Sequence, residues 1–302
     1  MTSRITLATR APVESVRARL GAALFERVAG AEGPRRRERI HGAPGPRRFD
    51  SGSPIQRVHG DASMFVGGLR ALLLQALHPL AMAAVEQHSG FRGDPWGRLQ
   101  RTSTFLAETT FGSDADARRA VEVVRAVHAR VAGAAPDGRP YAADNPHLLL
   151  WVHVAEVDSF LRAHDRYGAH PLSAHGRDEY VAQAAQVARD LGAEDPPETA
   201  AELARCLAVF RPELRSTPAA RRTARFMLVH PPVPWTQRGP YAVLSAAAVG
   251  LLPRWARLPL RVPYLPLTEA TAVRAAGVAL TSAIRWAMAP PEAGPRGVSA
   301  PH

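Results

Sequence analysis

The most hydrophobic stretch of the chain runs from Met64 to Val85, and it is long enough to cross a membrane. Four residues that suit a bilayer poorly interrupt it: Arg70, Gln75, His78 and Pro79. Polar side chains near the centre of a bilayer are costly, and a proline inside a helix removes a hydrogen bond and kinks the chain. The stretch is therefore predicted to be a buried central helix, kinked or broken at Pro79, rather than a membrane span.

Helical periodicity extends along most of the chain. Apolar residues recur at helical spacing from Val13 to Val28, before Gly30, and Asn145-Pro146 suits the start of a long helix. No stretch shows sustained strand alternation or a βαβ rhythm. The predicted fold class is mainly α: one multi-helix domain over residues 1–289, around a buried apolar pocket. Its expected parts are a helix at 12–29, a Pro- and Arg-rich arm at 33–54, a core at 57–228, C-terminal helices and Pro-rich connectors at 241–288, and a disordered tail at 290–302.

Arginine supplies all of the basic side-chain charge, because the 38 residues counted as Lys+Arg include no lysine. This bias accompanies abundant alanine and suggests a compositionally biased genome, so the net charge of +11 is weak evidence for a nucleic-acid partner. The densest basic cluster lies in the arm at 33–54, which we expect to be an extended loop. It has neither interleaved aromatic residues nor a nucleic-acid-binding signature. We therefore expect no nucleic-acid partner.

The single cysteine, Cys206, excludes a disulfide framework and a Cys-rich metal site. The segment from Met1 to Arg10 is polar and lacks the apolar region of a signal peptide. Together these observations predict a cytoplasmic protein. Three possibilities stay open for the arm: that it wraps the surface of its own domain, that it contacts a partner subunit in a homo-oligomer, or that it contacts an anionic membrane.

Residues 94–133 are predicted to form two consecutive helices that carry polar groups on apolar faces. Gly112 separates the two helices and Gly133 closes the second. Three polar residues share one face of the first helix, because they lie three and four positions apart: Arg98, Arg101 and Thr102. His128 lies on the apolar stripe of the second helix. This arrangement would suit a buried cofactor with anionic groups.

Three histidines fall at predicted core positions: His78, His128 and His153. One neutral imidazole on a helix is sufficient to hold haem iron, and arginine can bind the haem propionates with two hydrogen bonds. The alternative is that each is an ordinary core histidine with a hydrogen bond inside the protein. For His78 the partner would be a carbonyl freed by the break at Pro79. The residues alone leave both interpretations open.

Other cofactor signatures are missing from the sequence, which has no HExxH motif, Walker loop, strand-linked GxGxxG or GxSxG elbow. The pair Gly67-Gly68 lies in a helix-forming context and indicates close helix packing instead. His153 and Glu156 form a His-x-x-Glu pair that keeps a carboxylate-bridged di-iron site open. Its other candidate ligands are Glu86, Glu108 and Glu122.

An ordered series of motifs resembles the family of the latex-clearing rubber oxygenase and the MpaB-type oxygenases, whose members are mostly actinobacterial and fungal. The series is GGLRALLLQALHPLAMAAVEQHSGFRGDPWGRLQRTSTFLAETTFG at 67–112, VRAVHARVAG at 124–133, YAADNPHLLLWVHVAEVDSFL at 141–161 and YGAHPLS at 167–173. The resemblance is strong from roughly Arg57 to Leu191. It implies an all-helical, partly globin-like fold that holds a b-type haem, and an oxygenase that cleaves carbon–carbon double bonds of isoprenoids with O₂.

The resemblance also implies roles for individual residues. The family's helix with Arg, Lys and Thr matches Arg98, Arg101 and Thr102, which would be catalytic, with Arg98 also binding haem. The family's proximal haem histidine best matches His128, which would hold the iron. Arg101 stands where the rubber oxygenase has a distal lysine, so the sixth ligand stays undetermined. The spacing to His128 leaves His153 as a second candidate ligand, and His78 is a further haem-binding candidate.

The predicted function is therefore a haem b-dependent oxygenase that uses O₂ on a small apolar substrate of the alkene or isoprenoid type. The alternative is a non-catalytic helical protein that binds a lipid, an isoprenoid or haem. Such a protein would associate with an anionic membrane surface through its arginine-rich arm.

Overall fold

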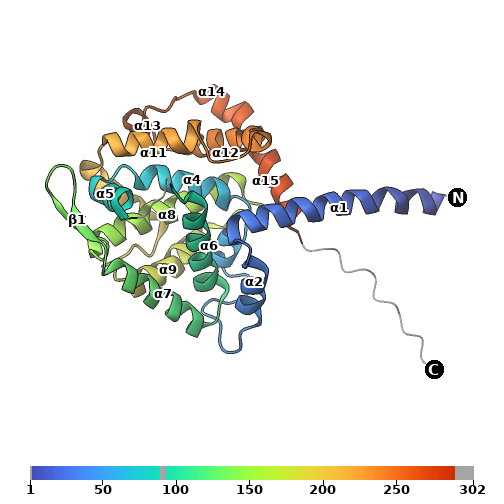
Figure 1. Ribbon diagram of the computed structural model, residues 1–302, viewed down its shortest axis with the longest axis horizontal. Helices are drawn as coiled ribbons and strands as arrows, with labels where there is room; N and C mark the ends of the chain where they lie inside the picture. Colours follow the sequence, from blue (N-terminus) through green and yellow to red (C-terminus); the bar gives the residue numbers. More distant parts are fainter. Residues whose placement is uncertain (1, 89–92, 290–302) are drawn as a thin grey trace.

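The computed structural model describes residues 2–88 and 93–289 (Figure 1). Helices dominate these residues, which confirms the prediction of a mainly α, single multi-helix domain. A short antiparallel hairpin of β1 (Ala132–Ala134) and β2 (Pro140–Ala142) is an exception that the sequence analysis did not predict. The tail at 290–302, expected to be disordered, lies outside the described residues.

The helices lie in three levels. In Figure 1, α4 and α8 cross the middle of the molecule, α11 to α14 lie above them, and α7 and α9 lie below. The long helix α1 extends away from this body toward the N-terminus. The bounds are α1 (Thr2–Ala29), α2 (Gly33–Gly42), α3 (Pro54–His59), α4 (Met64–Gln75), α5 (Pro79–His88), α6 (Pro95–Phe111), α7 (Asp114–His128), α8 (Pro146–Tyr167), α9 (Ala174–Leu191), α10 (Ala200–Phe210), the 3-10 turn η1 (Arg211–Glu213), α11 (Pro218–Val229), the 3-10 turn η2 (Trp235–Gln237), α12 (Arg238–Gly250), α13 (Arg254–Leu260), α14 (Pro266–Thr268), the π-helical turn η3 (Glu269–Val273) and α15 (Arg274–Met288).

The apolar stretch that begins at Met64 is broken as predicted. Helix α4 ends at Gln75, and α5 begins at Pro79 in a direction that differs by 106°. Among residues 2–88 and 93–289, no single helix has both the length and the hydropathy of a membrane span, whereas α4 and α5 reach them only as a bent pair. Apolar side chains of α4 are buried against α8, and these two helices form the centre of the core.

The prediction for residues 33–42 was wrong, because they form helix α2 and not an extended loop. The helix is attached to the body: Arg36 Nη1 donates to Thr104 Oγ1 at 2.8 Å, and Ile40 is 5% exposed. The following loop is held by Arg47, whose guanidinium donates to the carbonyls of Ile40 at 2.6 Å and Phe111 at 3.2 Å. The arginines of the arm thus bind the protein's own α6 region, which the composition of the arm could not reveal.

The C-terminal helix is tied to the start of the core. Arg285 on α15 donates from Nε to Asp61 Oδ2 at 2.7 Å and also to the carbonyl of Tyr167. Asp61 lies between α3 and α4, so this contact joins the C-terminal helix to the start of the core. The last of the C-terminal helices expected within 241–288 is α15, which continues directly from the π-helical turn η3.

The two adjacent glycines of α4 offer a matched test of the α4–α8 contact. A Cβ at Gly67 would lie 2.8 Å from Phe160 Cδ1 and 3.1 Å from Phe160 Cα, whereas a Cβ at Gly68 would meet nothing within 4 Å. We expect Gly67→Ala to lower the free energy of unfolding by about 1–3 kcal/mol through overpacking. Gly68→Ala should raise it by up to about 1 kcal/mol, because alanine is the better helix former. Equilibrium urea unfolding measures both, and equal effects would contradict the close approach.

Candidate functional site

Helix α6 begins just after Asp94, and α7 follows the separation predicted at Gly112. Asp94 Oδ1 accepts from the Gly97 amide at 2.8 Å and caps α6, and Ser113 Oγ accepts from the Asp116 amide at 3.2 Å and caps α7. The end of α7 differs from the prediction, because the helix ends at His128. Gly133 does not close it but lies in β1, opposite Tyr141. His128 therefore occupies the last turn of its helix, next to the loop that leads into the hairpin.

The three polar residues of α6 differ in exposure. Arg98 is half-buried. Burial lowers the pKa of its guanidinium, and repulsion from Arg101 is a second, smaller cause. Among the described residues, no hydrogen bond or ion pair engages the guanidinium of Arg98. Arg101 is exposed and forms an ion pair with Asp94 at 3.4 Å, and Thr102 is exposed as well. Arg98 is thus the one of the three with a partly desolvated and unpaired cation.

His128 and His153 each keep a buried ring nitrogen without a hydrogen-bond partner, Nδ1 of His128 and Nε2 of His153. Burial lowers the pKa of His128, against a smaller opposing effect of Asp144. Burial, with a contribution from Arg189, lowers the pKa of His153 to about 4. Both rings are therefore neutral at pH 7, and neutral imidazole is the form that ligates a metal. Leaving such a nitrogen unpaired costs about 1–3 kcal/mol, so both rings fit a role as ligands.

The two histidines lie on helices that share a neighbour. Helices α7 and α8 both pack against α9, and α6 packs against α7. One turn after His153, burial raises the pKa of Glu156 to about 7. Burial and the charge of Glu156 raise the pKa of Tyr180 on α9. No hydrogen bond or ion pair within the described part of the chain joins Arg98, His128 and His153, so their common site is a proposal that rests on the helices they occupy.

The third predicted histidine lies in a different setting. His78 is 2% exposed and precedes α5, where its Nδ1 accepts from the Ala81 amide at 3.4 Å. Its Nε2 lies 3.4 Å from Glu213 Oε2, and His147 Nε2 lies 2.9 Å from the same oxygen. Sequence reasoning singled out neither His147 nor Glu213. They are 66 residues apart in the sequence, and no short motif contains both.

The suggested di-iron ligands do not gather. Glu108 forms an ion pair with Arg39 at 3.2 Å, and Glu86 forms one with Arg222 at 2.7 Å. In the part of the chain that the structure describes, the one group of three or more residues with metal-binding spacing is His78, His147 and Glu213. The carboxylate-bridged alternative is therefore wrong for the residues named for it, because separate arginines bind two of the carboxylates.

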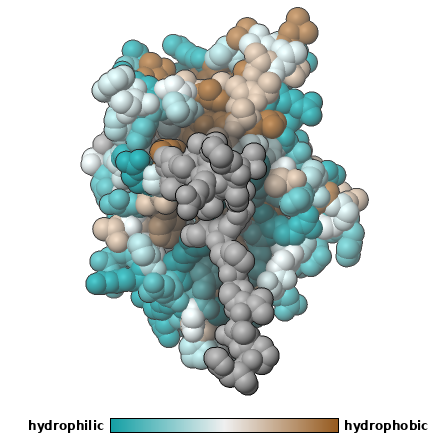
Figure 2. Space-filling view, turned by 90° about the vertical axis from the view of Figure 1, so that its right-hand side faces the viewer, coloured by the Kyte–Doolittle hydropathy of each residue, from teal (hydrophilic) through white to brown (hydrophobic). Residues whose placement is uncertain are grey.

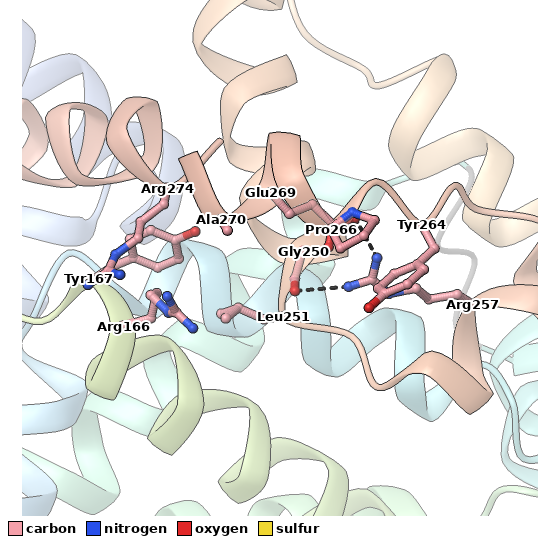
Figure 3. Close-up of a pocket in the computed structure, with 10 residues that line it drawn as sticks. All are labelled: Arg166, Tyr167, Gly250, Leu251, Arg257, Tyr264, Pro266, Glu269, Ala270 and Arg274. Carbon is pink, nitrogen blue, oxygen red and sulfur yellow. Dashed lines mark hydrogen bonds and ion pairs between the residues drawn. The ribbon is translucent and has the colours of Figure 1, made fainter. Parts of the chain in front are cut away.

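Two described cavities lie away from the histidines on α7 and α8. One, of about 250 Å³, lies between the end of α8, the end of α12 and the α14–η3 segment. Figure 3 shows that Arg257 on its wall binds Glu269 and the carbonyl of Gly250, with Arg166 and Arg274 near Tyr167. The second, of about 330 Å³, includes residues of α1 and α15. Arg166 is 13 residues after His153, about 20 Å along the helix, so the first cavity is a separate feature.

The described residues thus form a mainly helical domain in which His128 and His153 each keep an unpartnered ring nitrogen, and Arg98 on α6 carries a partly desolvated guanidinium. A comparison with protein families identifies which group it falls in. The family model described as "ER-bound oxygenase mpaB/B'/Rubber oxygenase, catalytic domain" matches residues 56–286, and the chain belongs to this family. The match confirms the resemblance seen in the sequence motifs. Comparisons with curated proteins and with solved structures returned no match.

Proposed function

We propose that the protein is a haem b-dependent oxygenase that uses O₂ to oxidise a small apolar substrate with alkene or isoprenoid character. Membership of the oxygenase family supports the class of reaction. The observation that supports the cofactor is that His128 and His153 each keep a buried ring nitrogen without a partner; His164 Nδ1 shares this property but lies at the far end of α8, 11 residues after His153. A buried polar atom is rarely left unpaired unless something outside the protein chain completes it.

The chain's own residues can be given roles in this proposal. His128 is the first candidate to hold the iron and His153 the second, because both rings stay neutral at pH 7. Arg98 would bind a propionate, since its half-buried guanidinium has no partner among the described residues. Arg101 and Thr102 are exposed on the same helix, which suits contact with a ligand that enters from solvent. The bound haem would supply the redox chemistry that activates O₂.

The absorption spectrum of the purified full-length protein tests the proposal. We expect a Soret band and about one haem per chain after expression with a haem supply, because one proximal imidazole holds one haem. Addition of an isoprenoid alkene and O₂ to the reduced protein should then give carbonyl products detectable by mass spectrometry. A protein that remains colourless after haem supplementation would contradict the proposal.

The alternative function is a lipid- or haem-binding protein on an anionic membrane. One observation favours it: large apolar side chains near the C-terminal helices are strongly exposed, among them Trp235 at 81%, Leu258 at 85% and Leu267 at 83%. Figure 2 shows apolar residues gathered in the upper part of the molecule, where these helices lie. Helix α2, the first part of the arm, is a weaker candidate for this contact, because it packs on α6. A colourless protein that floats with anionic vesicles would favour the alternative.

A further inference from the structure

Three segments that are distant in the sequence meet beside the break between α4 and α5. His78 immediately precedes α5, His147 lies in the first turn of α8, and Glu213 ends the turn η1. His78 and Glu213 are separated by 135 residues. A backbone hydrogen bond holds two of these segments together: the amide of Arg215, just after η1, donates to the carbonyl of Leu77, just before His78, at 2.8 Å.

The side chains converge on one point. His147 Nε2 lies 3.0 Å and 2.9 Å from the two oxygens of Glu213, and His78 Nε2 lies 3.4 Å from one of them. One ligand atom from each residue lies within 4.8 Å of the others. Zinc bonds to histidine nitrogen and carboxylate oxygen of about 2.0–2.1 Å place neighbouring tetrahedral ligand atoms about 3.3 Å apart. To surround an ion, the three ligand atoms would move to this spacing and the His78 proton would shift from Nε2 to Nδ1, at the cost of the long 3.4 Å contact with the Ala81 amide.

The neighbouring groups hold both rings in place. The ring of His78 lies 6.1 Å from the ring of Trp151, and the ring of His147 lies 4.7 Å from that of Phe210. Trp151 and Phe210 contact each other with ring centroids 5.2 Å apart, and both are fully buried. A rigid apolar support of this kind orients metal ligands and lowers the cost of bringing them together.

The local charge is compatible with a divalent cation. Glu213 brings a carboxylate to the two imidazoles. Burial lowers the pKa of His78, Glu213 opposes this shift, and His147 and Arg139 are minor causes that lower the pKa further. The charge of Arg139 is offset by its own ion pair with Asp137 at 2.8 Å. Without an ion, the same contacts are explained by two imidazole N–H groups that donate to Glu213. The two interpretations make different predictions for one measurable property, the affinity of the protein for a metal ion.

We propose that His78, His147 and Glu213 form a binding site for a divalent transition metal, with Zn²⁺ as the best match. Two imidazoles and one carboxylate are a recurring ligand set for Zn²⁺ when a fourth position stays open to water. The side chains of His147 and Glu213 are 51% and 40% exposed, so an ion can reach the site and keep a water molecule. The ion would join the start of α5, the start of α8 and η1. This site is independent of haem, because it uses neither His128 nor His153.

Isothermal titration of the EDTA-treated full-length protein with ZnCl₂ tests the proposal. We expect a binding step of about one Zn²⁺ per chain, weakened at least tenfold in both His147→Ala and Glu213→Gln, because each removes one of three ligands. Zn²⁺ should also raise the melting temperature of the wild type but not of these variants. Both positions are half-exposed, so the variants are expected to fold, and circular dichroism checks this.

The matched control is His175→Ala, which removes an exposed histidine from the first turn of α9. It should bind Zn²⁺ as the wild type does. The proposal is overturned if the wild type shows no saturable step, if His147→Ala binds as tightly as the wild type, or if His175→Ala loses the step as well.

Discussion

Asp158→Asn is expected to lower the free energy of unfolding by about 3–5 kcal/mol, because it leaves a buried arginine without its counter-charge. Arg70 on α4 is 1% exposed, and its Nη2 donates to Asp158 Oδ2 on α8 at 2.7 Å. Its other donors reach Ser159 Oγ at 2.6 Å and the carbonyl of Leu251 at 2.9 Å. The guanidinium thus connects α4, α8 and the end of α12, and an amide in place of the carboxylate cannot neutralise it. Guanidinium unfolding at pH 7 measures the loss.

The same substitution elsewhere on α8 serves as a control. Asp165 Oδ1 accepts from Arg177 Nε at 3.0 Å, but both side chains are partly exposed, at 32% and 40%. Ion pairs of this kind contribute about 0–1 kcal/mol, so Asp165→Asn should have little effect. Similar losses in the two variants would show that Asp158 is not a buried counter-ion and that the centre of the core admits water.

Arg70 and Asp158 also show what the sequence could and could not predict. Each stands inside an apolar segment, and Arg70 was one reason to place Met64–Val85 in a protein core instead of a bilayer. That the two pair with each other depends on how α4 crosses α8, which periodicity does not determine. Helix starts were predicted well, because a cap such as Asn145 acts on amides two or three residues away: its Oδ1 accepts from the amides of His147 and Leu148.

Local patterns failed where tertiary contacts decide the conformation. Residues 33–42 are rich in arginine and glycine, and only the contacts of Arg36 and Ile40 with the body explain why they form a helix. Gly133 is a plausible helix terminator by type, yet its backbone pairs with Tyr141 across a turn. The partner of Arg36 is 68 residues away in the sequence, and the partner of Gly133 becomes its neighbour only when the turn between them closes, so helical periodicity reveals neither contact.

In the candidate site, too, the sequence predicted the positions of residues along helices but not their contacts. Helical spacing correctly placed His78, His128 and His153 on or next to helices, with rings at least partly buried. Spacing could not indicate that His78 would meet His147 and Glu213, whereas His128 and His153 would keep unpaired nitrogens. Three histidines that looked equivalent in the sequence therefore belong to at least two different environments, and the assignment of an iron ligand concerns the two on α7 and α8.

His128→Ala is expected to remove the Soret band and to lower the haem content from about one per chain to near zero, because it deletes the proposed proximal ligand. His128 lies in the last turn of α7, next to the loop before β1, and is half-buried, so alanine should not disturb the fold. His153→Ala should keep the band. Added imidazole should restore the band in His128→Ala, since a free ring can occupy the space that the side chain leaves. Pyridine haemochrome assay and absorption spectra measure both effects.

An exposed histidine outside both sites, His170, provides the control, and His170→Ala should retain full haem content. Loss of the band in His153→Ala alone would show that His153, not His128, is the iron ligand. Its Nε2 is buried without a partner, and its pKa of about 4 keeps the ring neutral over a wider pH range. Retention of the band in both variants would mean that neither unpaired nitrogen binds iron. The two orphaned imidazoles would then be a cost to stability with no cofactor to offset it, and each alanine variant should unfold at a higher denaturant concentration than the wild type.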